Sequence, residues 1–223
     1  MQIVPAILTS DIDSFWNQIE RLLPFYNYFQ VDIMDGTYGD NKTISFKNIL
    51  ETAESKKSIC EKIKIDFQLI IKDPEVYYDE INKLKTKLNI KFIIFHYKTK
   101  LKIDLLYAKL GLNMGIALDP DDSIEQFQSE YDINRVKNIV IMTVYPKAQE
   151  QELLEYPLDK IEQLRNAGYR YYISVDGGVN ENTIPLIISK KFQPDYLNIG
   201  SYFSKAENLE ERINKVKVLI KSS

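Results

Sequence analysis

The chain has 223 residues, of which 44% are hydrophobic, and this length suits one α/β domain better than two small ones. Its formal net charge of −3 excludes a general attraction for nucleic acid or for anionic membranes. The apolar runs, such as the one at 139–142, are far shorter than the roughly 20 residues of a membrane helix, so no membrane span is expected.

The first residues, MQIVP, lack the basic and apolar regions of a signal peptide, and the chain has a single cysteine, Cys60. Proteins with this cysteine usage and no leader stay in a reducing compartment. We therefore expect a cytoplasmic protein.

Short β-branched or aromatic runs alternate with longer amphipathic stretches along the whole chain. Eight parallel strands crossed over by helices produce this pattern. The predicted strands cover 2–8, 27–33, 63–70, 90–96, 112–118, 137–144, 169–175 and 195–200. The predicted helices cover 11–23, 46–55, 74–88, 103–110, 123–128, 158–167, 181–189 and 209–220.

Eight uninterrupted strand–helix units favour closure into a (β/α)8 TIM barrel over an open, doubly wound sheet. No linker, charge run or change of composition divides the chain. We therefore expect one domain over 1–223, with its active site where loops leave the C-terminal ends of the strands.

Two segments place a carboxylate at such strand ends. The segment 31–36 reads VDIMDG and contains Asp32, and the segment 175–180 reads VDGGVN and contains Asp176. We expect strands two and seven on opposite sides of the barrel, so that the two carboxylates face each other across a substrate. This arrangement suits proton removal on one face of a carbon acid and proton return on the other. A divalent cation between the carboxylates would stabilise the enediolate charge.

Five blocks of the sequence, in this order and spacing, resemble the signature blocks of ribulose-phosphate 3-epimerases. They are VPAILTSD at 4–11, VDIMDG, IMTV at 141–144, VDGGVN, and IGSYF at 199–203. The resemblance extends over nearly the whole chain. It implies a ribulose-phosphate-binding type of TIM barrel, a cytoplasmic isomerase of the pentose phosphate part of carbohydrate metabolism, and a homo-oligomer, dimeric or larger.

The resemblance also implies the reaction and the roles of single residues. The reaction is inversion of C3 of a ketose phosphate, by default D-ribulose 5-phosphate, through two-base proton transfer and an enediolate. Asp32 and Asp176 would be the acid/base pair and metal ligands, while Met34 and Met142 line the site. The phosphate would meet backbone amides at positions whose small side chains allow close approach, namely Gly177, Gly178, Gly200 and Ser201.

The sequence departs from the family at the two histidines that bind the metal, which correspond here to Gln30 and Gln68. An amide oxygen can bind a hard cation but is a poorer ligand for zinc or iron than imidazole. We therefore expect a divalent ion (Mn, Mg, Zn or Fe) to be bound weakly by Asp32, Asp176, Gln68 and Gln30, with a preference moved toward Mg²⁺ or Mn²⁺. No organic cofactor is expected.

Other departures concern the walls of the site and the phosphate. Ala6 and Ile70 replace a serine and a third methionine of the family. The glycine-rich loop after strand six reads PKAQEQ at 146–151, where Lys147 offers a charge in place of bare backbone.

Two alternatives remain open. Loss of both histidines also fits a catalytically impaired barrel that binds a sugar phosphate or a protein partner. A decarboxylase or aldolase is less favoured, because Met34 stands where the Asp-x-Lys-x-x-Asp pattern of such decarboxylases needs a lysine. His96, the only histidine, is expected to be structural rather than catalytic, and Asp35 and Asp119 are expected to be turn or cap residues.

Overall fold

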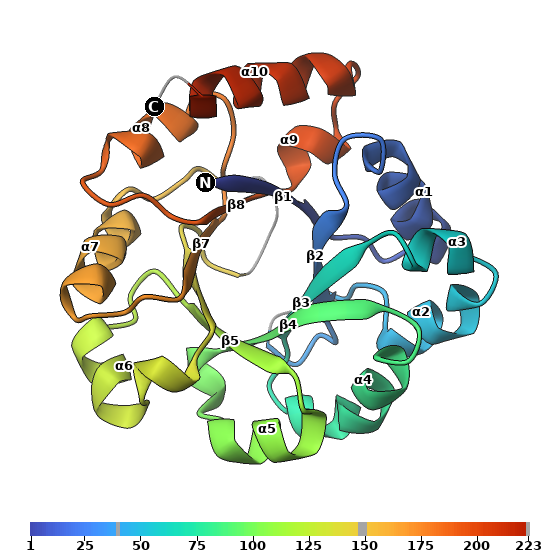
Figure 1. Ribbon diagram of the computed structural model, residues 1–223, viewed down its shortest axis with the longest axis horizontal. Coiled ribbons are helices and arrows are strands. Elements are labelled where there is room, and N and C mark those ends of the chain that lie inside the picture. Colours follow the sequence, from blue (N-terminus) through green and yellow to red (C-terminus); the bar gives the residue numbers. More distant parts are fainter. Residues whose placement is uncertain (39–40, 147–150, 222–223) are drawn as a thin grey trace.

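The computed structural model describes residues 1–38, 41–146 and 151–221. Eight parallel strands form a closed barrel in sequence order, with β8 pairing back to β1 (Figure 1). The strands are β1 (Gln2–Ile7), β2 (Tyr28–Met34), β3 (Lys64–Ile70), β4 (Asn89–His96), β5 (Asn113–Leu118), β6 (Asn138–Met142), β7 (Tyr172–Asp176) and β8 (Tyr196–Ile199). The predicted TIM barrel is confirmed.

Helices surround the barrel on its outside (Figure 1). They are α1 (Ile12–Leu22), α2 (Phe46–Ala53), α3 (Lys57–Cys60), α4 (Tyr78–Leu84), α5 (Ile103–Leu110), α6 (Ile124–Glu130), α7 (Asp159–Asn166), α8 (Ile184–Ser189), α9 (Ser201–Ser204) and α10 (Leu209–Lys221). Short 3-10 turns are η1 (Pro74–Tyr77), η2 (Tyr97–Thr99), η3 (Ile133–Arg135) and η4 (Tyr156–Leu158). No helix among the described residues is long and apolar enough to cross a bilayer.

Local chemistry explains where α1 begins and which face it buries. The carboxylate of Asp11 accepts a hydrogen bond from the backbone N–H of Ser14, which is the bond of an N-cap. Phe15, Trp16 and Ile19 recur at helical spacing and are buried against the barrel. The apolar face of α1 therefore packs against the barrel.

Two predicted elements start later than expected. The carbonyls of Tyr169 and Tyr171 accept hydrogen bonds from the Arg165 guanidinium instead of joining a strand ladder, so β7 begins at Tyr172. Helix α8 begins at Ile184, after a turn in which the Asn180 side chain accepts from the backbone of the following residues.

Strand alternation decides which side chains enter the barrel interior. On β2, Phe29, Val31 and Ile33 belong to the large core between strands and helices. Gln30 and Asp32 therefore point inward, because successive side chains of a strand face opposite sides.

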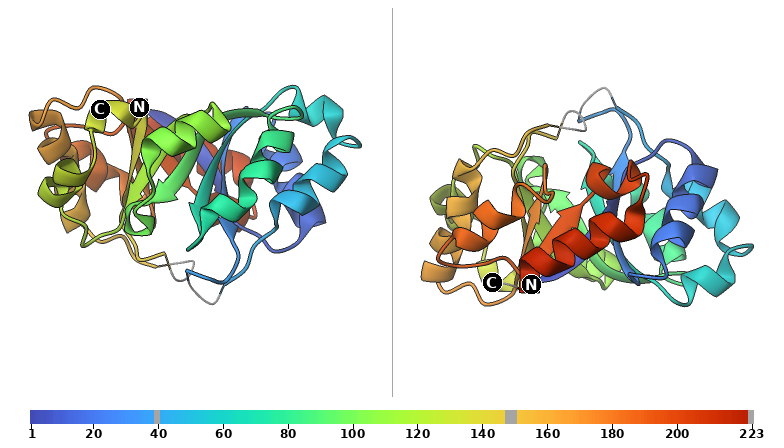
Figure 2. Two further views of the ribbon diagram at one scale, coloured as in Figure 1. Left: turned by 90° about the horizontal axis from the view of Figure 1, so that it is seen from below. Right: turned by 90° about the horizontal axis from the view of Figure 1, so that it is seen from above.

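The two ends of the barrel are distinct. The N-terminus and the last turn of α10 lie at the end where the strands begin (Figure 2). The C-terminal strand ends, and the loops that follow them, therefore open at the opposite end.

Candidate active site

A cavity of about 130 Å³ lies at the C-terminal ends of the strands. Its lining comes from the ends of β1, β2, β3, β6, β7 and β8 and from the loops that follow them. Among the lining residues are Ala6, Asp32, Met34, Gln68, Ile70, Met142, Asp176, Gly177, Gly178, Asn198, Gly200 and Ser201. Among the described residues, the structure thus brings into one cavity every residue proposed from the sequence for catalysis, substrate or metal, except Gln30, which contacts both carboxylates.

Pairing between strands sets these side chains at one level. Asp32 pairs with Gln68 across β2 and β3, and Asp176 pairs with Met142 on one side and Asn198 on the other. The strands β2 and β7, expected on opposite sides of the barrel, are separated by β1 and β8 on one side of the ring and by the other four strands on the other.

One amide group connects the two carboxylates. Nε2 of Gln30 donates to Oδ1 of Asp32 at 3.0 Å and to Oδ2 of Asp176 at 2.6 Å. The Gln30 amide oxygen accepts in turn from Nδ2 of Asn198. Both carboxylates are therefore held within hydrogen-bond distance of a single nitrogen.

Burial and mutual repulsion affect the protonation of this pair. Burial raises the pKa of Asp32 well above its usual range, and the neighbouring charge of Asp176 raises it further. Burial also raises the pKa of Asp176, but hydrogen bonds from Gln30, Asn198 and the Gly177 backbone oppose the rise. Since Asp176 receives more donors, a proton shared by the pair resides preferentially on Asp32. One acid and one base then stand side by side.

Gln68 differs from Gln30 in its contacts. Its side chain is fully buried, and Nε2 approaches the Met142 sulfur at 3.5 Å. Its Oε1 has no hydrogen-bond partner among the described residues. A buried carbonyl oxygen without a partner, beside Asp32 in the sheet, is an acceptor available to a ligand.

The loop after β7 offers backbone donors to an anion. The carbonyl of Gly177 accepts from Thr143, and the carbonyl of Gly178 accepts from Asn180 and Thr183. In a trans peptide the N–H points away from the carbonyl, so the N–H groups of Gly178 and Val179 point away from these partners. Both residues line the cavity, and such amides are suited to binding phosphate.

His96 and Asp119 form a buried pair beside the site. Nδ1 of His96 lies 3.0 Å from Oδ1 of Asp119, and Oδ2 of Asp119 accepts from Lys98 at 2.7 Å and from the Tyr38 hydroxyl at 3.2 Å. Burial raises the pKa of Asp119, but the contacts with His96 and Lys98 outweigh it and lower the pKa to about 2. Asp119 is therefore more than the turn residue expected from the sequence.

Asn198 was not predicted from the sequence as a site residue. It lies two residues before Gly200 on β8, and strand alternation would have placed both on the inner face. Lys147, proposed as a charge for the phosphate, lies outside the described residues.

The residues expected to bind a metal fit a cation only in part. Asp32, Asp176 and Gln68 present oxygen atoms, whereas Gln30 presents its N–H groups to the carboxylates. An N–H donor cannot coordinate a cation. The part of the chain that the structure describes holds no group of three or more histidine, cysteine, aspartate or glutamate side chains placed for a metal.

Comparison with known sequences gives one family. The model of the ribulose-phosphate 3-epimerase family matches residues 2–203. The ribulose-phosphate 3-epimerase of Schizosaccharomyces pombe is 26% identical over 187 residues, which cover 82% of this chain and 78% of that protein. The cytoplasmic isoform of Oryza sativa is 26% identical over 195 residues, covering 84% and 81%.

Solved structures with the same fold are more distant in sequence. A chain of the tryptophan synthase complex from Pyrococcus furiosus superposes with a TM-score of 0.71 at 11% identity, covering 97% of this chain and 98% of that one. The 3-hexulose-6-phosphate synthase from Salmonella typhimurium gives 0.67 at 10% identity, covering 100% and 99%. At such identities the likeness extends to the barrel alone.

Proposed function

Because the chain belongs to the ribulose-phosphate 3-epimerase family, we propose that it is an isomerase that inverts C3 of a ketose phosphate. D-ribulose 5-phosphate is the default substrate, since the relatives are named for it. The observation that carries the proposal is the convergence of Asp32 and Asp176 on one nitrogen at the mouth of the barrel.

The proposed reaction uses the two carboxyl groups in turn. The ionised Asp176 takes the C3 proton, and the electron pair of the broken C–H bond moves into an enediolate over C2 and C3. The protonated Asp32 then gives its proton to the opposite face of C3, which restores the ketone and yields the epimer. The next turnover in the same direction requires Asp176 to release this proton to water and Asp32 to take one up from water, after the product has left and before the next substrate binds.

The rest of the cavity positions the substrate in this proposal. The backbone N–H groups of Gly178, Gly200 and Ser201 bind the phosphate, while that of Gly177 donates to the Asp176 carboxylate. Met34 and Met142 form the apolar walls. The unpartnered Oε1 of Gln68 accepts a hydrogen bond from a substrate hydroxyl.

Replacing one carboxylate tests the mechanism. Asp176→Asn should abolish exchange of the substrate's C3 proton with D2O, followed by proton NMR, because an amide cannot take a proton from carbon. Asp66→Asn is the matched control, since Asp66 is a buried interior carboxyl that does not line the cavity. Undiminished exchange in Asp176→Asn would remove the mechanism.

A barrel that binds a sugar phosphate without converting it is the second candidate. The imidazoles of the family are absent at positions 30 and 68, and no histidine lines the cavity. Such a protein would be stabilised against heat by ketose phosphates yet show no C3 exchange, so the two measurements together separate the candidates.

A further inference from the structure

Gln30 contributes both of its amide hydrogens to the acidic pair. Its side chain is 1% exposed, and its two acceptors are the carboxylates of Asp32 and Asp176. The partial positive charge of the NH₂ group therefore faces both carboxyl groups.

The partner of the amide oxygen fixes this orientation. Asn198 is 3% exposed and donates from Nδ2 to Oε1 of Gln30. If the Gln30 amide were turned by 180°, its NH₂ group would face the NH₂ group of Asn198. Its oxygen would then face the carboxyl groups of Asp32 and Asp176. Buried polar groups left with such clashes or missing partners destabilise the folded protein, so the observed orientation is favoured.

A cation with Gln30 among its ligands would require that reversal. To coordinate an ion between Asp32 and Asp176, Gln30 would have to present Oε1, and Asn198 would have to reverse as well. In the observed orientation, Asn198 donates to Gln30 and Gln30 donates to both carboxyl groups, so these hydrogen bonds connect the acidic pair without an ion.

We propose that Gln30 takes the place of a divalent cation as the bridge between Asp32 and Asp176, so that the epimerisation requires no bound metal. This inference rests on the function proposed above. Gln30 is a positioning residue, because it acts through the two carboxyl groups and not on the substrate.

The charge balance of the reaction is compatible with a metal-free site. Removal of the C3 proton moves one negative charge from a carboxylate to the enediolate, and the net charge of the site does not change. Both carboxyl groups are then protonated, and each can donate a hydrogen bond to an enediolate oxygen, as neutral carboxylic acids do in other enolising enzymes.

Chelation of the unaltered protein is the first experiment. The protein is treated with EDTA, its metal content is measured by mass spectrometry, and C3 exchange of D-ribulose 5-phosphate in D2O is followed by NMR with and without added Mn²⁺, Mg²⁺ or Zn²⁺. We expect the metal-free protein to exchange within about twofold of the supplemented protein.

The other outcomes of this experiment distinguish failure of the role assigned to Gln30 from failure of the proposed epimerase function. Exchange that is lost on chelation and restored by a cation overturns the role assigned to Gln30 but leaves the epimerase function in place. If no C3 exchange is seen with or without cations, on D-ribulose 5-phosphate and on other ketose phosphates, both the proposed function and this inference are overturned.

A variant tests Gln30 itself. Gln30→Leu removes both donors at similar volume and should lower kcat about 100-fold with little change in KM, because the carboxyl groups lose their alignment while the phosphate contacts remain. Asn138→Leu is the matched control: it replaces another buried interior amide, bonded to Ser174 and not to the acidic pair, and should keep kcat. Equal kcat values for the two variants would contradict the proposal.

Discussion

Single glycines decide how closely the loops after β6 and β7 approach each other. A Cβ on Gly177 would lie 2.6 Å from Val144 Cγ2, and one on Gly178 would lie 2.7 Å from the backbone nitrogen of Leu153. Both glycines also have positive φ angles, +114° and +64°. Packing alone therefore requires glycine at these two positions, whatever ligand the loop binds.

Gly178→Ala and Gly168→Ala form a matched pair for this claim. Gly168 has a φ of +88° but nothing within 4 Å of its Cβ position, so alanine there adds backbone strain only, of about 1 kcal/mol. Gly178→Ala adds a collision with backbone and should lower the free energy of unfolding by about 2–4 kcal/mol. Urea unfolding measures both, and equal losses would show that contact with Leu153 is unimportant.

For single residues, the sequence predicted which side chains line the cavity better than it predicted their hydrogen-bond partners. Asp32, Asp176 and the glycines were identified from short blocks that the structure brings together. Gln30 and Gln68 were treated alike, although one donates to carboxylates and the other approaches Met142. The orientation of an amide depends on partners from β6 and β8, far along the chain, so it cannot be derived from local sequence.

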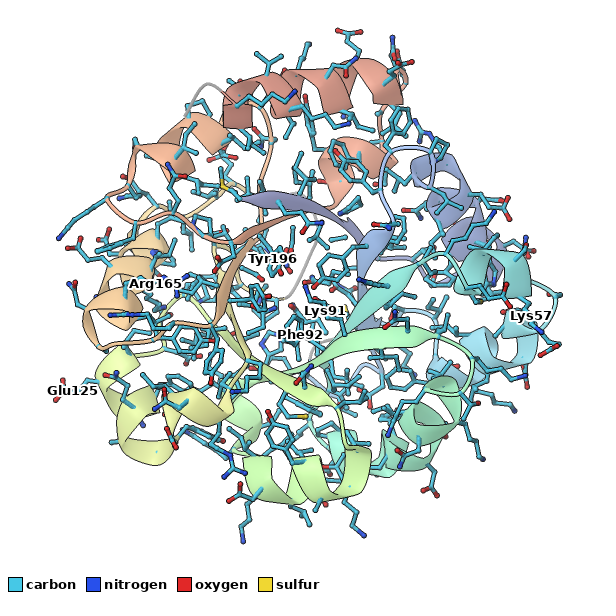
Figure 3. All side chains as sticks on the ribbon, in the orientation of Figure 1. Lys57, Lys91, Phe92, Glu125, Arg165 and Tyr196 are labelled. Carbon is cyan, nitrogen blue, oxygen red and sulfur yellow. The ribbon has the colours of Figure 1, made fainter. Side chains whose placement is uncertain are left out.

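The strands also build the closed end of the barrel, where a partly buried lysine is surrounded by aromatic rings. Nζ of Lys91 lies 4.3–5.1 Å from the ring centres of four aromatic residues and donates to the Tyr196 hydroxyl at 2.7 Å. Figure 3 shows Lys91, Phe92 and Tyr196 near the barrel axis, whereas Lys57 and Glu125 lie at the periphery. Asp66 accepts hydrogen bonds there from Tyr28 and from the backbone of Phe92.

Asp66 should make stability depend on pH. Burial raises its pKa to about 7, against opposing effects of Tyr28 and Lys91. Because the folded-state pKa is above the unfolded one, the folded protein holds a proton that the unfolded chain has lost between about pH 4 and pH 7. The free energy of unfolding therefore falls as pH rises through this range, by about 1.4 kcal/mol per pH unit attributable to Asp66. Asp66→Asn should flatten this dependence in urea unfolding, and an unchanged slope would show that Asp66 is ionised throughout.

The alternation of apolar runs predicted the strands and most helices, but not their interruptions. The stretch predicted as one helix over 74–88 divides into η1 and α4, and the short helices α3 and α9 were not predicted. Four-residue helices are too short to produce a periodic pattern. They depend on tertiary contacts, as α9 does on its packing beside β1.

In the molecule as a whole, the barrel separates the acidic pair at its mouth from the polar residues around Asp66 and Lys91 at its other end. An apolar cluster formed by Phe92, Ile94, Ala117, Val140 and Met142 fills the interior between them. Variants of Asp66 should therefore change stability without changing exchange. The sequence predicted this architecture because eight strand–helix units leave few other ways to bury their apolar faces, while the homo-oligomer stays a prediction.

The central claim is that two carboxyl groups transfer protons on opposite faces of C3, and the early course of turnover in D2O tests it most directly. At low conversion we predict one deuterium at C3 in each molecule of epimer formed, with little deuterium in the remaining ketose, because one group removes the substrate's proton and the other delivers a solvent-derived one. Epimer that retains the substrate's own C3 hydrogen would contradict the account.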